Sequence, residues 1–281
     1  MVDLDLEKFF DRVNHDQLMG QVAKRITDQR LLRLLRAFLT AGVLAEGLVS
    51  PTLEGTPQGG PLSPLLSNVV LDALDRELER RGHRFVRYAD DCNVYVRSAR
   101  AGQRVMASLT RFLTQRLKRT VNRAKSAVAP PGERTFLGCS FTRPPVPRRR
   151  LAPSTVTRCK AKVRALTRRT RGVSLETMVQ QLSIYLRGWH GYFGFCQTPS
   201  VLRDLDAWIR RRLRSAVWKQ WKRGPTRVTE LRRRGVDLLL ATLTAGSAHG
   251  PWRLSHSRAM HLALPKAFFA TLGLPELAAG R

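Results

Sequence analysis

The chain begins with a strand-like alternation of apolar and acidic residues. Between Val2 and Leu6 apolar residues alternate with Asp3 and Asp5, and this period of two predicts an extended segment with one buried face and one acidic face. Later segments instead place apolar residues every three or four positions, which predicts helices. These segments are 18–39, with a break near Thr27-Asp28, then 64–80, 103–118 and 201–223.

A second acidic stretch lies in the middle of the first half. The β-prone runs Phe85–Tyr88 and Asn93–Val96 flank Ala89-Asp90-Asp91, so a tight hairpin with two carboxylates at its tip is predicted. An exposed turn is the simplest interpretation of this stretch. The alternative is that divalent cations hold the carboxylates, since Mg²⁺ prefers carboxylate oxygens and a two-metal site takes acidic groups from more than one element.

The order strand, helix, helix, hairpin, helix, strand predicts an α+β domain with an antiparallel sheet under helices, which we assign to residues 1–142. Residues 142–150 hold three prolines and four arginines and predict a linker. Basic helices with apolar stripes follow, so we expect an α-helical domain over 143–245 and a tail over 246–281. On the helix predicted at 64–80, the acidic residues Asp72, Asp75, Glu77 and Glu79 are expected to form a solvated face, and His15 a polar contact near a helix cap.

Charge separates the two halves. The 281 residues carry a net charge of +29. Residues 1–142 have 22 basic and 15 acidic residues, and residues 143–281 have 28 basic and 6 acidic ones. Such an excess of positive charge predicts a polyanionic partner, with nucleic acid favoured over an anionic membrane surface. The sequence contains no run of eighteen apolar residues, so no membrane span is predicted. Its first residues do not have the pattern of a secretory signal peptide.

Cysteine spacing argues against two kinds of site. Cys92, Cys139, Cys159 and Cys196 form no C-x-x-C pair, so neither zinc binding nor a disulfide framework is predicted. We expect free, mostly packed thiols in a reducing cytoplasm.

Three motifs in order carry a resemblance to a known family. The first is the acidic segment from Val2 to Asp11, which contains Phe9-Phe10. The second leads into a predicted helix and reads Gly55-Thr56-Pro57-Gln58-Gly59-Gly60-Pro61. The third is the predicted hairpin, with Tyr88-Ala89-Asp90-Asp91 at its tip. This series resembles the reverse transcriptases encoded by group II introns, and it implies a polymerase palm. The segment 187–193 is similar to the family's thumb, or maturase-specific, region, and 251–274 to its C-terminus, so a retron-type enzyme is disfavoured.

The resemblance implies roles for individual residues of the first half. Asp5 and Asp90 would hold two Mg²⁺ ions, with Asp91 beside them. Phe10 would lie under the sugar of the incoming dNTP, with Phe9 as the alternative. The implied nucleotide and template contacts are Gln58, Gly59 and Lys125. An RNA template and a DNA primer would be the other substrates, whereas Asp3 is expected to be structural.

For the second half the resemblance implies contacts to the intron RNA. The basic helices supply the candidate RNA-binding residues Arg164, Arg168, Arg169, Arg187, Arg210, Arg211 and Arg214. Aromatic residues lie among them at 185–193. They can stack on bases or form a helix–helix core, and core packing is favoured for Trp189 and Phe193.

Two functions follow from the resemblance. The first is an RNA-directed DNA polymerase of group II intron type that also binds intron RNA and helps it to splice. The second is a non-catalytic RNA-binding maturase or a degenerate remnant of such an enzyme. Family members begin with a fingers region ahead of the first acidic strand, and Met1 lies inside that strand here. We therefore expect a truncated form.

Overall fold

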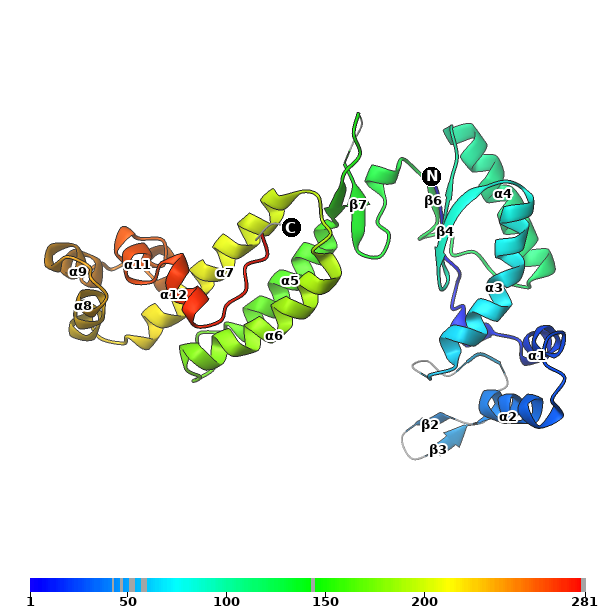
Figure 1. The fold of residues 1–281 in the computed structure, drawn as a ribbon, viewed down its shortest axis with the longest axis horizontal. Coiled ribbons are helices and arrows are strands. Elements are labelled where there is room, and N and C mark those ends of the chain that lie inside the picture. Colours follow the sequence, from blue (N-terminus) through cyan, green and yellow to red (C-terminus); the bar gives the residue numbers. More distant parts are fainter. Residues whose placement is uncertain (42, 46–47, 51–53, 57–59, 143–144, 279–281) are drawn as a thin grey trace. The chain divides into compact units, whose positions relative to one another are not determined.

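The computed structural model describes residues 1–41, 43–45, 48–50, 54–56, 60–142 and 145–278. They form two compact units, Met1–Arg134 and Thr135–Arg281 (Figure 1). The predicted boundary at 142/143 falls inside a hairpin that belongs to the second unit. Within that unit the hairpin is tied to the helices that follow, because Gly138 O accepts hydrogen bonds from Ala152 N and Thr155 Oγ1.

A four-stranded antiparallel sheet organises the first unit. Its order is β4-β5-β1-β6, so the N-terminal strand lies between the central hairpin and a strand from the end of the unit. The strands are β1 (Val2–Leu4), β4 (Arg84–Tyr88), β5 (Asp91–Tyr95) and β6 (Ala127–Val128). A separate two-stranded hairpin pairs β2 (Val43–Ala45) with β3 (Leu48–Ser50).

Helices cover one face of this sheet (Figure 1). Val2, Leu4 and Val94 are fully buried there, together with leucines of α3 and α4. The helices of this unit, with one 3₁₀ turn, are η1 (Phe10–Arg12), α1 (His15–Ala23), α2 (Gln29–Thr40), α3 (Ser63–Arg80) and α4 (Ala99–Arg116), and a second 3₁₀ turn, η2 (Pro131–Glu133), follows β6. The other face of the sheet carries the polar residues of β1 and β5, and the candidate chemistry lies there.

The second unit is mostly helical. A hairpin of β7 (Cys139–Phe141) and β8 (Arg149–Leu151) precedes α5 (Pro153–Leu166), α6 (Leu175–Phe193), α7 (Pro199–Gln220), α8 (Gly224–Arg233), α9 (Leu238–Ala245), α10 (Pro251–Leu254), α11 (Arg258–Ala263) and α12 (Lys266–Thr271). Met178, Leu182 and Trp218 lie in its buried core. Asp206 is also buried, and its carboxylate accepts hydrogen bonds from Leu277 N and Ala278 N, both at 3.0 Å, which fixes the chain after α12 to α7.

Several local predictions can be compared with the structure. The helix predicted over 18–39 breaks as expected, because Asp28 ends the preceding loop and caps α2 through Arg30 N and Leu31 N. The predicted α+β architecture is confirmed. All four cysteines are free, and Cys92 and Cys159 are buried. No helix in the described part of the chain has the length and apolar character needed to cross a membrane.

Helix α4 approaches the sheet closely at Gly102. A Cβ atom on Gly102 would lie 2.5 Å from Val128 Cγ1 and 3.4 Å from Val96 Cγ2. Val side chains are stiff at χ1, so this contact cannot relax cheaply. By contrast, a Cβ on Gly20 of α1 would meet nothing within 4 Å.

These two glycines give a matched test of the packing. Gly20→Ala is expected to raise the free energy of unfolding by up to about 1 kcal/mol, because alanine is the better helix former. Gly102→Ala gains the same propensity but overpacks the sheet, and it is expected to lower stability by about 1–3 kcal/mol. Urea unfolding followed by circular dichroism measures both; a stabilised Gly102→Ala protein would contradict the close contact.

Candidate active site

Strand pairing brings the two acidic segments together. In the β1–β5 register Leu4 is opposite Cys92 and Asp3 is opposite Asn93. Continuing this register by one residue places Asp5 opposite Asp91. Since opposite residues of an antiparallel pair share a face, the carboxylates stand on the polar face of the sheet, with Leu4 and Cys92 buried on the other.

Asp90 sits at the tip of the β4–β5 hairpin. Strand β4 ends at Tyr88 and β5 begins at Asp91, so Ala89 and Asp90 form the turn. Ala89 has φ of 51°, a left-handed conformation that costs a residue with a Cβ some strain. The turn is therefore held by its surroundings rather than preferred by the sequence.

The carboxyls of this turn are crowded. Burial raises the pKa of Asp90, the charge of Asp5 raises it further, and a backbone hydrogen bond and Lys125 act in the opposite direction. Burial also raises the pKa of Asp91, followed by the charges of Asp90, Asp5 and Asp3. Half-buried negative charges thus repel one another at this point of the sheet.

Asp5 has one oxygen paired and one without a partner. Its Oδ2 lies 3.6 Å from Lys125 Nζ, whereas Oδ1 is buried and has no hydrogen-bond partner among the described residues. The loop that carries Lys125 is fixed to Asp5 by backbone contacts: Asp5 N donates to Ser126 Oγ at 3.0 Å and Asn122 N donates to Asp5 O at 2.9 Å. The fold therefore holds Lys125, a predicted nucleotide contact, close to Asp5.

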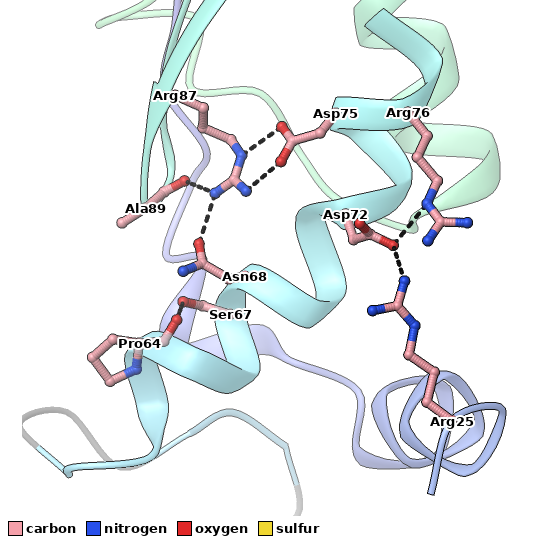
Figure 2. A network of polar contacts seen from close by, with 9 residues as sticks. All are labelled: Arg25, Pro64, Ser67, Asn68, Asp72, Asp75, Arg76, Arg87 and Ala89. Atoms are coloured by element: carbon pink, nitrogen blue, oxygen red, sulfur yellow. Dashed lines mark hydrogen bonds and ion pairs between the residues drawn. The ribbon is translucent and has the colours of Figure 1, made fainter. Parts of the chain in front are cut away.

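The side chain of Arg87 connects the turn to α3 (Figure 2). Its guanidinium forms a bidentate pair with Asp75 of α3, with Nε–Oδ1 and Nη2–Oδ2 distances of 2.7 and 2.5 Å. Nη1 donates to Asn68 Oδ1 and to Ala89 O, both at 2.9 Å. The side chain of Arg87 is only 10% exposed, and its hydrogen bonds to Asp75 raise its pKa. The strained turn is thus tied to α3 through one buried cation.

This network corrects the prediction of a solvated acidic face on α3. Asp75 instead points toward Arg87, and Glu77 pairs with Arg80 and Arg81. Only Asp72 fits the prediction among the carboxylates drawn in Figure 2, since it is 49% exposed and meets Arg25 and Arg76. Sequence spacing could not identify the Arg87–Asp75 pair because its members lie on a strand and a helix twelve residues apart.

The two adjacent phenylalanines have different environments. Phe9 is 2% exposed and packs in the core, whereas Phe10 is half-buried, and their rings meet edge to face at 5.4 Å. Arg119 lies over the Phe9 ring at 5.7 Å and donates to Arg12 O, although it is itself buried. Of the two alternatives, Phe10 is the more exposed residue.

A loop segment lies against Phe10. Thr56 N donates to Phe10 O and Gly55 N donates to Val13 O, both at 2.7 Å. The buried ring of His15 is hydrogen-bonded through Nε2 to Gly55 O at 2.7 Å. His15 therefore anchors the loop, a more specific role than the cap contact predicted from sequence. The candidate nucleotide contacts Gln58 and Gly59 lie outside the described residues.

The acidic residues can be compared with what a divalent cation needs. In the described part of the chain no group of three or more His, Cys, Asp or Glu side chains is gathered closely enough to hold a metal ion. Three features nevertheless suit a hard cation: carboxylate oxygens as donors, the orphaned Oδ1 of Asp5, and the mutual repulsion of Asp90 and Asp91. The chemistry of the donors therefore fits Mg²⁺.

The predicted RNA-binding residues differ in exposure. Arg164, Arg168, Arg169 and Arg187 are exposed, whereas Arg210 and Arg211 are half-buried. Arg214 is only 5% exposed. Trp189 is buried and packs on Phe193 at 5.1 Å, so the core role favoured for this aromatic pair is confirmed.

Comparison with known families agrees with this geometry. Residues 1–141 match the model of the reverse transcriptase (RNA-dependent DNA polymerase) family, and the chain belongs to that family. Residues 156–235 match the maturase-specific domain of group II introns. The chain thus joins a reverse transcriptase family match to a match with the maturase-specific domain of group II introns, in the order that the sequence motifs indicated.

Individual relatives match over short segments. The chain is 43% identical over 81 residues to Protein YkfC of Escherichia coli, which covers 29% of this chain and 21% of the relative. It is 41% identical over 75 residues to the group II intron-encoded protein LtrA of Lactococcus lactis, covering 27% and 12%. Apo telomerase from Candida tropicalis aligns with a TM-score of 0.45 and 12% identity over 97% of this chain and 53% of that one, a likeness too weak to add to the assignment.

The Arg87–Asp75 pair is expected to contribute far more to stability than the more exposed Arg76–Asp72 pair. Arg87→Met leaves a half-buried carboxylate and the Ala89 carbonyl without their partner and should lower the free energy of unfolding by about 3 kcal/mol. Arg76→Met removes a partner of the exposed Asp72 and should cost less than about 1 kcal/mol. Denaturant unfolding of both variants checks this; equal effects would contradict the structural importance of the clamp.

The crowded carboxyls predict that the metal-free protein becomes less stable as pH rises. A raised pKa in the folded state means that the folded protein binds protons more tightly than the unfolded chain, so stability falls as pH rises from the ordinary Asp value through the raised one. In EDTA at neutral pH, Asp90→Asn should therefore raise the melting temperature. The difference should vanish at a pH below the ordinary Asp pKa, and a gap unaffected by pH would contradict this cause.

Proposed function

We propose that this chain is the palm and maturase part of an RNA-directed DNA polymerase of group II intron type. The proposal rests above all on one observation: carboxylates from two segments far apart in sequence come close, with Asp5 opposite Asp91 and Asp90 beside it in the turn, where they are half-buried and repel one another. The folding energy spent on that arrangement is recovered when cations bind. The matches to curated relatives span about a fifth of their length or less, so the activity of the whole protein is part of this proposal.

In the proposed reaction the residues have separate tasks. Asp5 and Asp90 would hold two Mg²⁺ ions with Asp91 beside them, and the bound metal would lower the pKa of the primer 3′-hydroxyl and offset charge on the phosphates of the dNTP. The exposed ammonium of Lys125 can turn from Asp5 toward the triphosphate. The ring of Phe10 would lie under the sugar and exclude a 2′-hydroxyl. Arg87 keeps the carboxylate of Asp90 at its place on the turn.

The second unit would bind the intron RNA and help it fold and splice. Exposed arginines on α5 and α6 support this role, as does the net charge of residues 143–281. We propose that the thumb and maturase-specific helices extend over 143–245 and that 246–281 completes the maturase region. The competing function is a maturase without polymerase activity, in which the first unit serves only as a scaffold.

Primer extension on poly(rA)/oligo(dT) with Mg²⁺ tests the catalytic proposal. Asp90→Asn and Asp5→Asn are each expected to abolish extension, because a lost metal ligand should raise the barrier by several kcal/mol, which is roughly a thousandfold or more in rate. Asp72→Asn, at the exposed carboxylate of α3, is the control and should leave the rate unchanged. Extension by Asp90→Asn at the wild-type rate would refute the site, and RNA binding without extension by the wild type would favour the non-catalytic maturase.

RNA binding should be strongly dependent on salt. Neutralising about six phosphates of a single strand gives a slope of log K against log salt of roughly −4, so affinity should fall by over two decades between about 50 and 200 mM salt. Structured RNA should compete better than a homopolymer, because rigidly placed arginines recognise shape. Filter binding of the whole chain measures the salt dependence and the competition. A flat salt dependence would mean that the basic surface serves only to keep the protein in solution.

A further inference from the structure

Three of the predicted RNA-binding arginines, Arg210, Arg211 and Arg214, line one basic cavity of the second unit. It lies between α7 and the segment around α11 and has a volume of about 500 Å³. Trp208, Arg210, Arg211 and Arg214 line it from α7, and His261 and Lys266 from the other side. The volume is that of a ligand site rather than of a bare ion.

The arginines of this cavity lack acidic partners. None of Arg210, Arg211 and Arg214 forms an ion pair with a carboxylate of the described residues, and Lys266 alone is paired, with Glu276 at 2.6 Å. The nearest acid along α7 is Asp206. Its two oxygens are already engaged by the backbone N–H groups of Leu277 and Ala278.

Arg214 is a buried arginine whose positive charge has no carboxylate partner among the described residues. It is 5% exposed, and its donors reach only neutral groups: Nε donates to Leu264 O at 3.0 Å, and Nη1 lies 3.3 Å from His261 Nε2. Burial and the charge of Arg210 lower its pKa to about 10. A buried guanidinium without a counter-charge is costly, and an anion in the cavity would remove most of that cost.

Arg211, which also lines the cavity, is not fully satisfied either. It stacks over Trp252 at 4.1 Å and donates from Nη2 to Trp252 O at 3.2 Å, but its buried Nε has no hydrogen-bond partner among the described residues. Trp208 lines the cavity with an aromatic ring and is itself flanked by Lys160, Arg164 and Arg212 at 5.5–5.8 Å. The cavity thus joins positive charge with a flat apolar surface.

We propose that this cavity binds one backbone phosphate of an RNA strand, with the sugar of that nucleotide against Trp208. A phosphodiester supplies the missing negative charge and the acceptor oxygens, and arginine suits phosphate because its donors are arranged in a planar fork. The inference rests on the proposed RNA binding of this unit and specifies where one strand is held. Inorganic phosphate shares the chemistry and is the other ligand to be tested.

Arg210→Gln is the informative variant, because Arg210 is half-buried, lines the cavity and makes no hydrogen bond within the described part of the chain. Lys219→Gln is the matched control: it removes one charge from the same helix at an exposed position nine residues on, on the opposite side of the helix. Arg210→Lys restores the charge without the fork. Melting curves of all three variants check that each is folded.

Fluorescence anisotropy of a labelled twelve-nucleotide RNA with the whole chain gives the affinities at several salt concentrations. Arg210→Gln should weaken binding by about tenfold or more and reduce the salt slope by about 0.7, whereas Lys219→Gln should weaken it by less than about threefold. Arg210→Lys should recover only part of the loss.

Three results would overturn the inference. Equal losses in Arg210→Gln and Lys219→Gln would mean that the cavity is not a contact, while RNA binding and the proposed function would stand. Binding of inorganic phosphate that depends on Arg210, with RNA affinity unchanged by the variant, would make the cavity a free-anion site. No RNA binding by the wild type at low salt would refute both the cavity and the RNA-binding part of the proposed function.

Discussion

The first unit depends on the antiparallel pairing of β1 with β5. This ladder connects residues about ninety positions apart, buries Leu4 and Cys92 on one face, and in doing so fixes Asp5 opposite Asp91 on the other. A shift of one residue would send every carboxylate into the core and every core residue into water, so hydrophobic burial determines the register of the acidic face. The energy that assembles the candidate site is therefore that of the core beneath it.

Cations lie on both sides of the sheet near that face, and one of them, Lys125, offsets part of the repulsion. Lys125 approaches Asp5 from the polar face, and Arg87 holds the turn from the helical side through Asp75 and the carbonyl of Ala89. The second unit shows the opposite imbalance, with guanidinium groups whose counter-charge the described residues do not supply. The acidic face of the first unit thus favours cations and the arginine-lined cavity of the second favours anions, which agrees with the proposed roles of metal in one unit and of arginine in the other.

Periodicity predicted much of the fold from the sequence. The alternation at 2–6 and the apolar stripes of α3 and α7 are local signals, and the structure has elements at these places. The two acidic segments could likewise be found from their composition. The contacts that shape the site were not predictable in this way: His15 to Gly55 and Arg87 to Asp75 join different elements, and Arg and Asp are common enough on helices that their exposed and buried forms look alike in sequence. The same limit hid the burial of Arg214 among exposed arginines.

The position of Gly55 links the loop that begins there to the segment carrying Phe10, and the proposed reaction gives these two parts separate roles. Its φ is 92°, and a Cβ there would lie 2.7 Å from the backbone oxygen of Asp11, directly after Phe10. The loop at Gly55 and the segment that carries Phe10 are consequently joined backbone to backbone, with no side chain between them. If the proposed roles hold, template contact and sugar discrimination would be mechanically coupled. A change in the shape of this loop would then be felt at the ring proposed to select deoxyribose.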